Sequence, residues 1–572
     1  MKRIPYGISD YKVLQEEDYI FVDKTKYIEK LEKYHSPYIF FLRPRRFGKS
    51  LFTSMLTYYY DSSKEDDFEK LFKGSYIYEN LTKKKNKYCV LSFTFSGLNT
   101  ENVEILKESF MNRVKSGFSD FIKKYNLNID IDDIDKKDPA MALDSFFAHV
   151  NRNIKYPIFV IIDEYDHFAN ELLSFKPELF KDLVSKTGFV RKWYEILKDW
   201  TKEENMVQRI FATGVAPLTL DSMTSGFNIG DNLTRNELFH EMIGFTDSEV
   251  RNLIESTSKK ELTEEELEEL MIILRTNYNG YLFSERANTR LFNSDMILYY
   301  LKYYVETGEG PKKLIDENIA SDYNKIGNLF NLTTKGSSTK IIEKILKGEE
   351  LVGEITTQFN LERDFYEEDF LSLLFYLGFL TIDEEELMDV IYKVPNEAVK
   401  GIYFDYFAKK LEEDSLHEID SIVIKKAIKA ISMKGDINSF IEVVERTLNK
   451  LSNRDFMAFD EKYIKIIMIA YLNLAKAYLI KSEYEVENGY IDIALLNNYV
   501  IRPKYYGIIE LKYITKKEYE QQGEDLVNRR KEEAIAQINK YKTSEELIKL
   551  PNLKKWVLVF VKDRCVINLE MK

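Results

Sequence analysis

The octapeptide RPRRFGKS, Arg43 to Ser50, has the residue types of a phosphate-binding loop. Such loops follow the pattern G-x-x-x-x-G-K-[ST], and here Arg43 replaces the first glycine. In these loops, successive backbone N–H groups and the N-terminus of the following helix surround phosphate oxygens. Pro44 has no N–H, but the residues from Arg46 to Ser50 keep theirs. The missing glycine therefore does not exclude a nucleotide site.

The sequence on both sides of the loop supports this interpretation. The apolar run at 38–42 predicts a strand before the loop, and residues 51–60 have helical spacing after it. A second apolar run, at 158–162, ends in Asp163 and Glu164. That arrangement is typical of sites where one carboxylate binds Mg²⁺ and the next lies beside an attacking water.

A further strand is predicted at 209–214, and it carries Thr213 near its end. If this strand lies between the other two, we expect the Thr213 hydroxyl near the γ-phosphate. The residues predicted to contact ATP are Arg45, Arg46, Phe47, Gly48, Lys49, Ser50, Leu51, Asp163 and Thr213. Ser50 and Asp163 are predicted to hold Mg²⁺, and Glu164 is the predicted catalytic carboxylate. The arginines Arg45 and Arg46 are equally explicable as solvated charges.

A second group of residues suits metal-assisted phosphodiester hydrolysis. Glu510 and Lys512 are two apart in a predicted strand and project to the same face. A neighbouring strand is expected to bring Asp492 beside them. The carboxylates of Asp492 and Glu510 would hold Mg²⁺ or Mn²⁺, and the Lys512 ammonium would stabilise developing charge. An isolated Glu-x-Lys is more often a surface ion pair. The metal-site interpretation therefore depends on the neighbouring strands and the following helix.

The elements that must position these residues define an α/β multidomain chain. Alternating strands, which include a further apolar run at 89–95, and amphipathic helices predict a three-layer α/β domain over 1–240. Helices dominate 241–400, where the apolar helix at 369–380 runs into two strand-like pieces. This pattern indicates a winged-helix-like module or, equally, a helical linker with a hairpin. A helical linker and a last α/β domain are expected over 401–572, and the apolar run at 556–561 is the last predicted strand.

The composition of the chain limits its possible partners and its cellular compartment. The chain has 572 residues and a net charge of −13, so any DNA contact needs a local basic groove. Cys89 and Cys565 have no neighbours at metal-ligand spacing, which favours a reducing compartment. No apolar run has the length of a signal peptide core or a membrane span. We therefore expect a cytoplasmic protein with no membrane association, and a homo-oligomer is left open.

The segments PYGISDYKVLQEEDYIFVDKTKYIEKL, RPRRFGKS, IIDEYD and ATGV resemble the bacterial and archaeal AAA-ATPase-like family. Members of that family share the arginine at the first loop position and commonly carry a C-terminal nuclease-like domain. The spacing of Asp492, Glu510 and Lys512 resembles the PD-(D/E)XK nuclease superfamily, which implies a restriction-endonuclease-like fold.

The same resemblance implies further catalytic positions at Glu483 and Gln537 and another carboxylate at Glu461. One departure is Tyr490, which stands where the superfamily often has arginine, so contacts with the substrate are in doubt there.

Two functions follow from these residues. The leading hypothesis is an ATPase coupled to a metal-dependent nuclease that acts on nucleic acid, with DNA favoured. The alternative is an ATP-dependent regulatory switch whose last domain binds nucleic acid or protein without cutting. A metabolic kinase would need an acceptor pocket that the sequence does not indicate.

Overall fold

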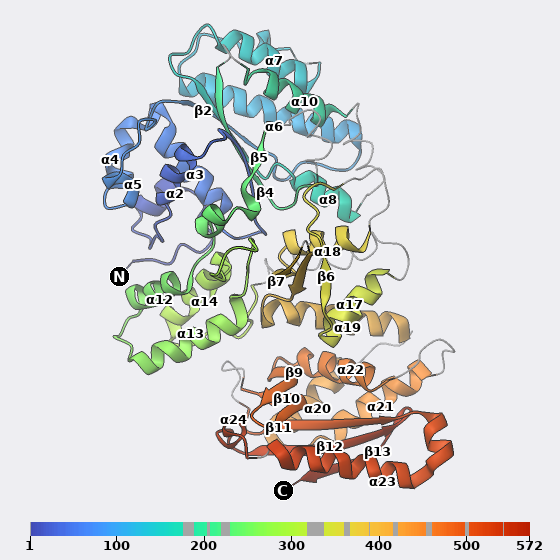
Figure 1. Cartoon of the computed structure of the whole chain (residues 1–572). Helices are drawn as coiled ribbons and strands as arrows, with labels where there is room; N and C mark the ends of the chain where they lie inside the picture. The colour runs from blue at the N-terminus through green and yellow to red at the C-terminus, as the bar shows by residue number, and fades with distance from the viewer. Residues whose placement is uncertain are drawn as a thin grey trace. The chain divides into compact units, whose positions relative to one another are not determined.

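The computed structural model (Figure 1) describes residues 2–135, 137–175, 188–202, 206–218, 229–316, 337–359, 366–387, 389–415, 421–452, 460–497, 503–541 and 543–571. They form two compact units. Unit 1 is Met1–Ile341 with Glu350–Glu397, and unit 2 is Ile342–Glu349 with Ala398–Lys572. The division into three domains at 240 and 400 stays a prediction, whereas the α/β fold class is confirmed.

Unit 1 contains a five-stranded parallel sheet in the order β2-β3-β4-β1-β5. Its strands are β1 (Tyr38–Leu42), β2 (Cys89–Thr94), β3 (Ile158–Asp163), β4 (Val207–Gly214) and β5 (Asp231–Asn232). The first four were predicted from their apolar runs. The sequence gives no signal for β5, because two polar residues have no apolar pattern.

Helices cover both faces of this sheet. They are α1 (Tyr11–Glu16), α2 (Lys26–Lys33), α3 (Lys49–Tyr60), α4 (Phe68–Phe72), α5 (Tyr76–Glu79), α6 (Val103–Lys124), α7 (Pro139–Val150), α8 (His167–Phe175) and α10 (Phe189–Asp199). Phe93 of β2 packs against Gly117 of α6 and Trp193 of α10. On the other face, Phe159 of β3 packs against Tyr60 of α3. The predicted three-layer arrangement is therefore present, with α6, α7 and α10 grouped on one side (Figure 1).

The rest of unit 1 is largely helical, as predicted. Its elements are η3 (Leu233–Arg235), η4 (Glu237–Met242), α12 (Asp247–Thr257), α13 (Glu264–Tyr278), α14 (Ser294–Thr307), β6 (Leu351–Gly353), α18 (Glu367–Tyr376), β7 (Thr381–Glu386) and β8 (Asp389–Lys393). Thr246 and Thr263 form capping boxes that begin α12 and α13. The predicted helix and hairpin are α18 and β7–β8, and β6 pairs with β8 to complete an antiparallel sheet.

The helix α17 (Ser337–Lys347) contributes residues to both units, and α19 (Glu397–Ser415) begins at their boundary. The remaining helices of unit 2 are α20 (Ser421–Lys434), α21 (Asn438–Ser452), α22 (Glu461–Leu474), α23 (Lys516–Tyr541) and α24 (Glu545–Ile548). Its strands are β9 (Leu479–Val486), β10 (Gly489–Leu496), β11 (Tyr506–Ile514), β12 (Leu553–Val561) and β13 (Arg564–Met571).

These strands form one sheet in the order β13-β12-β11-β10-β9. The first three in sequence are antiparallel neighbours, and α23 then connects β11 to the parallel strand β12. The sequence-based prediction ended at β12 and missed β13, an antiparallel edge strand with no continuous apolar run.

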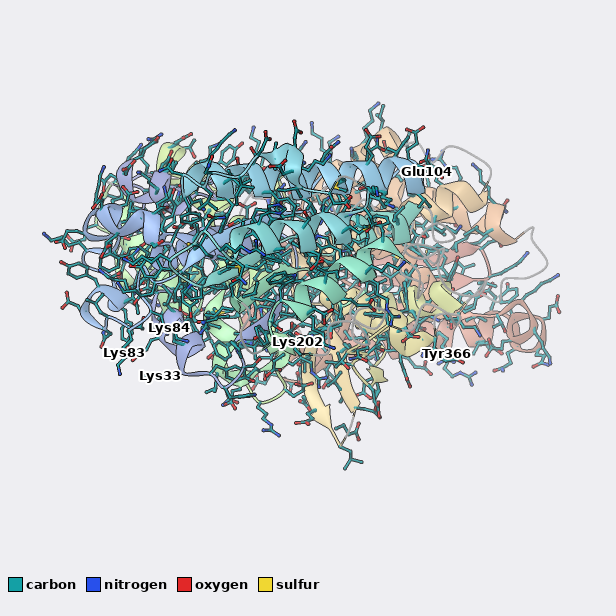
Figure 2. The ribbon with its side chains drawn as sticks, turned by 90° about the horizontal axis from the view of Figure 1, so that it is seen from above. Lys33, Lys83, Lys84, Glu104, Lys202 and Tyr366 are labelled. Atoms are coloured by element: carbon teal, nitrogen blue, oxygen red, sulfur yellow. The ribbon has the colours of Figure 1, made fainter. Side chains whose placement is uncertain are left out.

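Many charged side chains lie at the surface. Figure 2 labels Lys33, Lys83 and Lys84 in unit 1, where Lys33 and Lys83 are exposed. Within the ranges that the structure describes, no helix combines the length and apolar character needed to cross a bilayer.

Candidate nucleotide site and candidate metal site

The predicted phosphate-binding loop connects β1 to α3, which is the expected strand, loop and helix order. Gly48 directly precedes α3 and has φ 96°, a left-handed conformation that strains other residues. Arg46 is also left-handed, with φ 65°. Left-handed residues before a helix turn backbone N–H groups toward one point, which suits an anion.

Lys49 begins α3, and its side chain folds back onto the loop. Its Nζ donates to the carbonyl oxygens of Arg43 at 3.0 Å and Pro44 at 2.9 Å. Burial lowers the pKa of Lys49 to about 8, although Asp163 and other nearby carboxylates oppose the shift. The ammonium is thus desolvated and held by neutral carbonyls, so a phosphate oxygen would be a stronger partner.

A cavity of about 400 Å³ adjoins the loop. Every residue from Arg45 to Phe52 lines it, together with Ser96, Glu164 and His167. Lys49 therefore borders open space despite its burial. Apolar side chains such as Leu14, Met55 and Leu253 line another part of the same cavity.

Ser50 and Asp163 come together as predicted for a magnesium site. Asp163 ends β3, and its carboxylate accepts a hydrogen bond from the Ser50 side chain. Burial raises the pKa of Asp163, and the Ser50 hydrogen bond opposes that shift. A hydroxyl and a carboxylate are oxygen ligands of the kind Mg²⁺ prefers, so these two residues fit the ion.

Glu164 follows Asp163 in a left-handed conformation with φ 53°. Its carboxylate lies 3.1 Å from Nδ1 of His167, and this contact lowers the pKa of Glu164. Glu164 therefore stays ionised, as a residue that orients or deprotonates water must. The sequence analysis did not single out His167, which lies one turn along at the start of α8.

Strand β4 lies between β3 and β1, as the prediction for Thr213 required. The Thr213 hydroxyl is buried and donates to the carbonyl oxygen of Phe41 at 2.9 Å. The hydroxyl proton is therefore already engaged within the sheet, and a role at the γ-phosphate stays a prediction.

Asp166 fixes the loop that carries Asp163 and Glu164. Its fully buried carboxylate accepts from the backbone N–H of Val215 at 3.0 Å and of Ala216 at 2.6 Å. A Cβ at Gly214 would lie 2.2 Å from Asp166 Oδ1, so this close approach requires glycine. The sequence signal was present in the motif IIDEYD, whose last residue is Asp166.

The loop is also held by the N-terminus of α14. The Ser294 hydroxyl donates to the Phe47 carbonyl at 3.1 Å, and the Asp295 N–H donates to the Arg46 carbonyl at 3.2 Å. The Arg46 guanidinium donates to the Asp295 carboxylate at 3.0 Å. Phe47 is a core residue, so only its backbone is available to a phosphate. No motif in the sequence pointed to this support from α14.

Arg43, the residue in place of the first loop glycine, is a structural cation. It is 1% exposed and lies 4.3 Å from the ring centroids of both Phe41 and Phe283. Its guanidinium donates to the carbonyls of Leu42, Thr234 and His240. Burial lowers the pKa of Arg43 to about 9, which still leaves it charged at neutral pH.

We expect Arg43→Gly, which restores the usual loop pattern, to destabilise the protein by at least about 3 kcal/mol. The change removes a large buried side chain and leaves three carbonyls without their donor. Chemical denaturation measures the effect, and Arg45→Gly, in a partly exposed position of the same loop, is the matched control. Equal stability of the two variants would contradict this role for Arg43.

His240 makes the free energy of unfolding depend on pH. Its Nε2 lies 2.7 Å from the Thr289 carbonyl, and burial, with Arg43 nearby, lowers its pKa to about 4. The folded state therefore binds fewer protons than the unfolded state between pH 6.5 and about 4, so stability falls as the pH falls through this window. At pH 5 the cost is about 2 kcal/mol. The melting temperature of His240→Gln should fall less between pH 7 and pH 5 than that of the wild type, and equal falls would refute the assignment.

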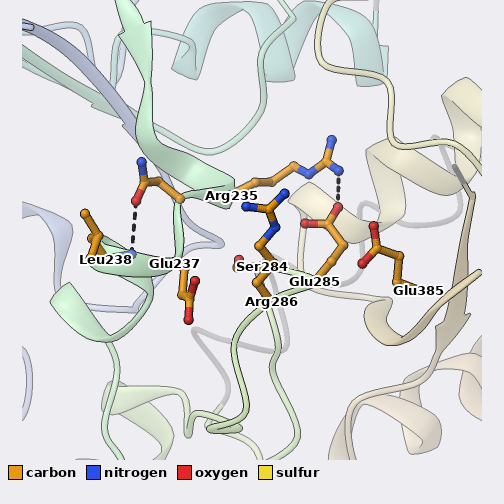
Figure 3. Close-up of a pocket in the computed structure, with 8 residues that line it drawn as sticks. Arg235, Glu237, Leu238, Ser284, Glu285, Arg286 and Glu385 are labelled. Carbon is orange, nitrogen blue, oxygen red and sulfur yellow. Dashed lines mark hydrogen bonds and ion pairs between the residues drawn. The ribbon is translucent and has the colours of Figure 1, made fainter. Parts of the chain in front are cut away.

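A second cavity of about 400 Å³ is polar (Figure 3). It is lined by residues 235–238, residues 284–286 and Glu385 of β7, and Arg235 forms an ion pair with Glu285. These segments come from both sides of the predicted boundary at 240 and lie within unit 1. They include no residue of the phosphate-binding loop.

In unit 2, the predicted residues of the second site come together. The register that pairs Ile493 with Ile509 sets Asp492 of β10 beside Glu510 of β11. The Nζ of Lys512 lies 3.5 Å from Glu510 Oε2 and 3.8 Å from Asp492 Oδ2. Asp492 Oδ2 also accepts from the Leu511 N–H at 2.8 Å. Two carboxylates and a lysine thus converge in a buried position.

The helix α23 covers this group. Burial, together with the adjacent Asp492, raises the pKa of Glu510 well above its ordinary value. The Tyr541 hydroxyl hydrogen-bonds to the Glu510 carboxylate. Gln537 lies one turn earlier, and its Oε1 is buried without a hydrogen-bond partner among the described residues. The sequence analysis did not single out Tyr541. The available signal was its spacing of four residues from Gln537, which places both on one face of the helix.

The helix α22 closes the site from another direction. Glu461 Oε2 accepts from the Tyr513 N–H at 3.1 Å, and burial raises the pKa of Glu461. Lys465, four residues later, pairs with both Asp492 and Glu483. Glu483 is a left-handed residue within β9, with φ 48° and a largely exposed side chain. Lys465 was also missed, although its spacing from Glu461 places both on one helix face.

The acidic residues fit a divalent cation. Four carboxyl groups and two ammonium groups gather here, and burial, together with Asp492, raises the pKa of Glu510. Within the ranges described, no set of three or more His, Cys, Asp or Glu side chains is grouped to hold an ion. At this site an ammonium, Lys465, separates Glu483 from Asp492. The adjacent pair Asp492 and Glu510 would hold the cation.

Two family models match ranges of the chain that include the residues of both candidate sites. Residues 5–224 match a predicted AAA-ATPase, and residues 459–570 match the PD-(D/E)XK nuclease superfamily. The chain therefore contains a predicted AAA-ATPase domain and, at its C-terminal end, a domain of the PD-(D/E)XK nuclease superfamily. Both resemblances found in the sequence are confirmed.

Two individual proteins are also similar to this chain. An uncharacterized protein in the vnfD 5′ region of Azotobacter chroococcum mcd 1 is 24% identical over 394 residues, which cover 67% of this chain and 64% of that protein. The Walker-type ATPase of Pyrococcus abyssi matches 66% of this chain and 94% of its own at 12% identity. The TM-score of that match is 0.35, too low to support a conclusion about the fold.

Proposed function

We propose that the protein binds and hydrolyses ATP in unit 1 and cleaves nucleic-acid phosphodiester bonds in unit 2 in a metal-dependent reaction. The observation that carries the proposal is the convergence of Asp492, Glu510 and Lys512 from two neighbouring strands. The chain also has, in unit 1, a phosphate-binding loop whose Lys49 lines a cavity. Two families of hydrolytic domain on one chain support coupling between the two reactions.

At the nucleotide site, the N–H groups from Arg46 to Ser50 would bind the phosphates. Lys49 would leave the carbonyls of Arg43 and Pro44 and bind the β- and γ-phosphates. Ser50 and Asp163 would hold Mg²⁺, and Glu164 would orient the attacking water.

At the second site, Asp492 and Glu510 would hold Mg²⁺ or Mn²⁺. When bound, the ion polarises the phosphate and lowers the pKa of its water. Lys512 would stabilise charge on the phosphate from its place beside both carboxylates. The hydrogen bond from Tyr541 keeps Glu510 in a fixed orientation.

A second candidate function is binding of nucleic acid without cutting. The observation that favours it is Tyr490, which replaces the arginine common in the superfamily. Its side chain is 57% exposed and its hydroxyl donates to Glu485 at 3.3 Å. A substrate contact that arginine would make to a phosphate is therefore absent at this position.

The test is a cleavage assay on single- and double-stranded DNA and RNA with Mg²⁺ or Mn²⁺, with and without ATP. The proposal predicts cleavage that stops with EDTA and changes in rate with ATP. Asp492→Asn should abolish it. Binding of a substrate by both proteins, with cleavage by neither, would replace this proposal by the second candidate.

A further inference from the structure

Lys465 is a second buried lysine at the candidate metal site, in addition to Lys512. It projects from α22, and its Nζ lies 2.8 Å from Asp492 Oδ1. The same ammonium pairs with Glu483. Its side chain is 8% exposed, so the charge is held inside the protein rather than at its surface.

The two oxygens of Asp492 have different surroundings. Oδ2 accepts the Leu511 N–H and lies on the side of Lys512, which is also beside Glu510. Oδ1 lies on the side of Lys465 and Glu483. Asp492 therefore separates two acidic positions. The Lys465 ammonium lies in direct hydrogen-bond contact with Oδ1, at 2.8 Å, whereas the Lys512 ammonium is 3.8 Å from Oδ2.

Enzymes that use two metal ions hold them about 3.5–4 Å apart. At that separation one carboxylate can bind both ions, each through one oxygen. With the first ion on the side of Glu510, the second ion would need Asp492 Oδ1 and Glu483 as ligands. These are the two groups that Lys465 binds.

A divalent ion and an ammonium group cannot occupy this position together. Both are cations, and their repulsion is weakly screened in a buried site. If Lys465 moved out to solvent, Asp492 Oδ1 and Glu483 would lose their ion pairs, while Asp492 Oδ2 would keep the Leu511 N–H and Lys512.

We propose that Lys465 takes the place of a second divalent ion and restricts the site to one Mg²⁺ or Mn²⁺ per chain. The inference rests on the proposed metal-dependent function of the same site. Lys465 is a positioning residue in this account, since it fixes Asp492 and Glu483 and supplies one positive charge at the position of a second ion.

The experiment counts bound Mn²⁺ by isothermal titration calorimetry on the full chain without nucleotide. Asp163→Asn is present in every sample, so that the nucleotide site lacks its carboxylate ligand. We expect one ion with Lys465 in place and two in Lys465→Met, which has a similar shape and no charge. Lys465→Arg, which keeps the charge, should stay at one. Electron paramagnetic resonance should show coupled Mn²⁺ pairs only in Lys465→Met.

The outcomes separate the two proposals. One ion in Lys465→Met, or two ions with Lys465 in place, would overturn the role of Lys465 and leave the metal-dependent function standing. No ion in any variant would overturn the proposed function itself. Circular dichroism checks folding, and Lys465→Gln replaces Lys465→Met in the same titration if the latter does not fold.

Discussion

Lys49→Ala is expected to weaken ATP binding at least about a hundredfold, because it removes the only loop cation placed at the start of α3. The Lys49 ammonium is buried and bonded to two carbonyls, which are weaker partners than a triphosphate. Fluorescence titration with a labelled ATP analogue measures the loss.

The control for this variant is Lys33→Ala, which removes an exposed lysine of α2 from the same unit. It should bind ATP like the wild type. Lys49→Ala also loses two buried hydrogen bonds, so its melting temperature must be measured alongside. ATP affinity retained by a folded Lys49→Ala protein would show that the loop is not the phosphate site.

The double variant Glu510→Gln, Lys512→Met is expected to reduce nucleic-acid cleavage about a thousandfold. Glutamine keeps the shape of Glu510 but removes a charged ligand, and methionine removes the ammonium beside both carboxylates. The rate of nicking of supercoiled plasmid with Mn²⁺ measures the effect.

The matched control neutralises an exposed pair of the same two residue types. Lys516 and Glu520 form an ion pair on α23 with side chains 71% and 64% exposed. Lys516→Met, Glu520→Gln should leave cleavage unchanged. If the Glu510 and Lys512 variant cuts as fast as this control, the cleavage site lies elsewhere.

The sequence predicted the strands of the nucleotide domain well because parallel strands covered on both faces have continuous apolar runs. Ser50 and Asp163 also meet as predicted, since the loop and the carboxyl end of β3 lie at one edge of the same sheet. Strand β13 was missed because an edge strand need not be apolar.

The supporting contacts could not be read from sequence. The substitution at Arg43 was interpreted as a tolerated loss of glycine, whereas the structure gives the arginine a role of its own between Phe41 and Phe283. Phe283 is distant in the sequence, so only the folded chain brings it to the loop. Lys465 and Tyr541 reach the second site in the same way, from helices that pack on the sheet.

The support from α14 has a consequence for coupling. Asp295 bonds both the backbone and the guanidinium of Arg46, so a loop that closes on phosphates would act directly on α14. Pro44 also packs against Gly378, the residue that precedes the β7–β8 hairpin by three positions. The loop thus contacts the helical part of unit 1 at more than one point.

The most direct test of two separate sites is an anomalous diffraction map from crystals grown with Mn²⁺ and a non-hydrolysable ATP analogue. The account predicts one Mn²⁺ peak beside Ser50 and Asp163, with the triphosphate on Lys49, and another within coordination distance of Asp492 and Glu510. A nucleotide bound away from Lys49, or no peak at the two carboxylates of unit 2, would contradict it.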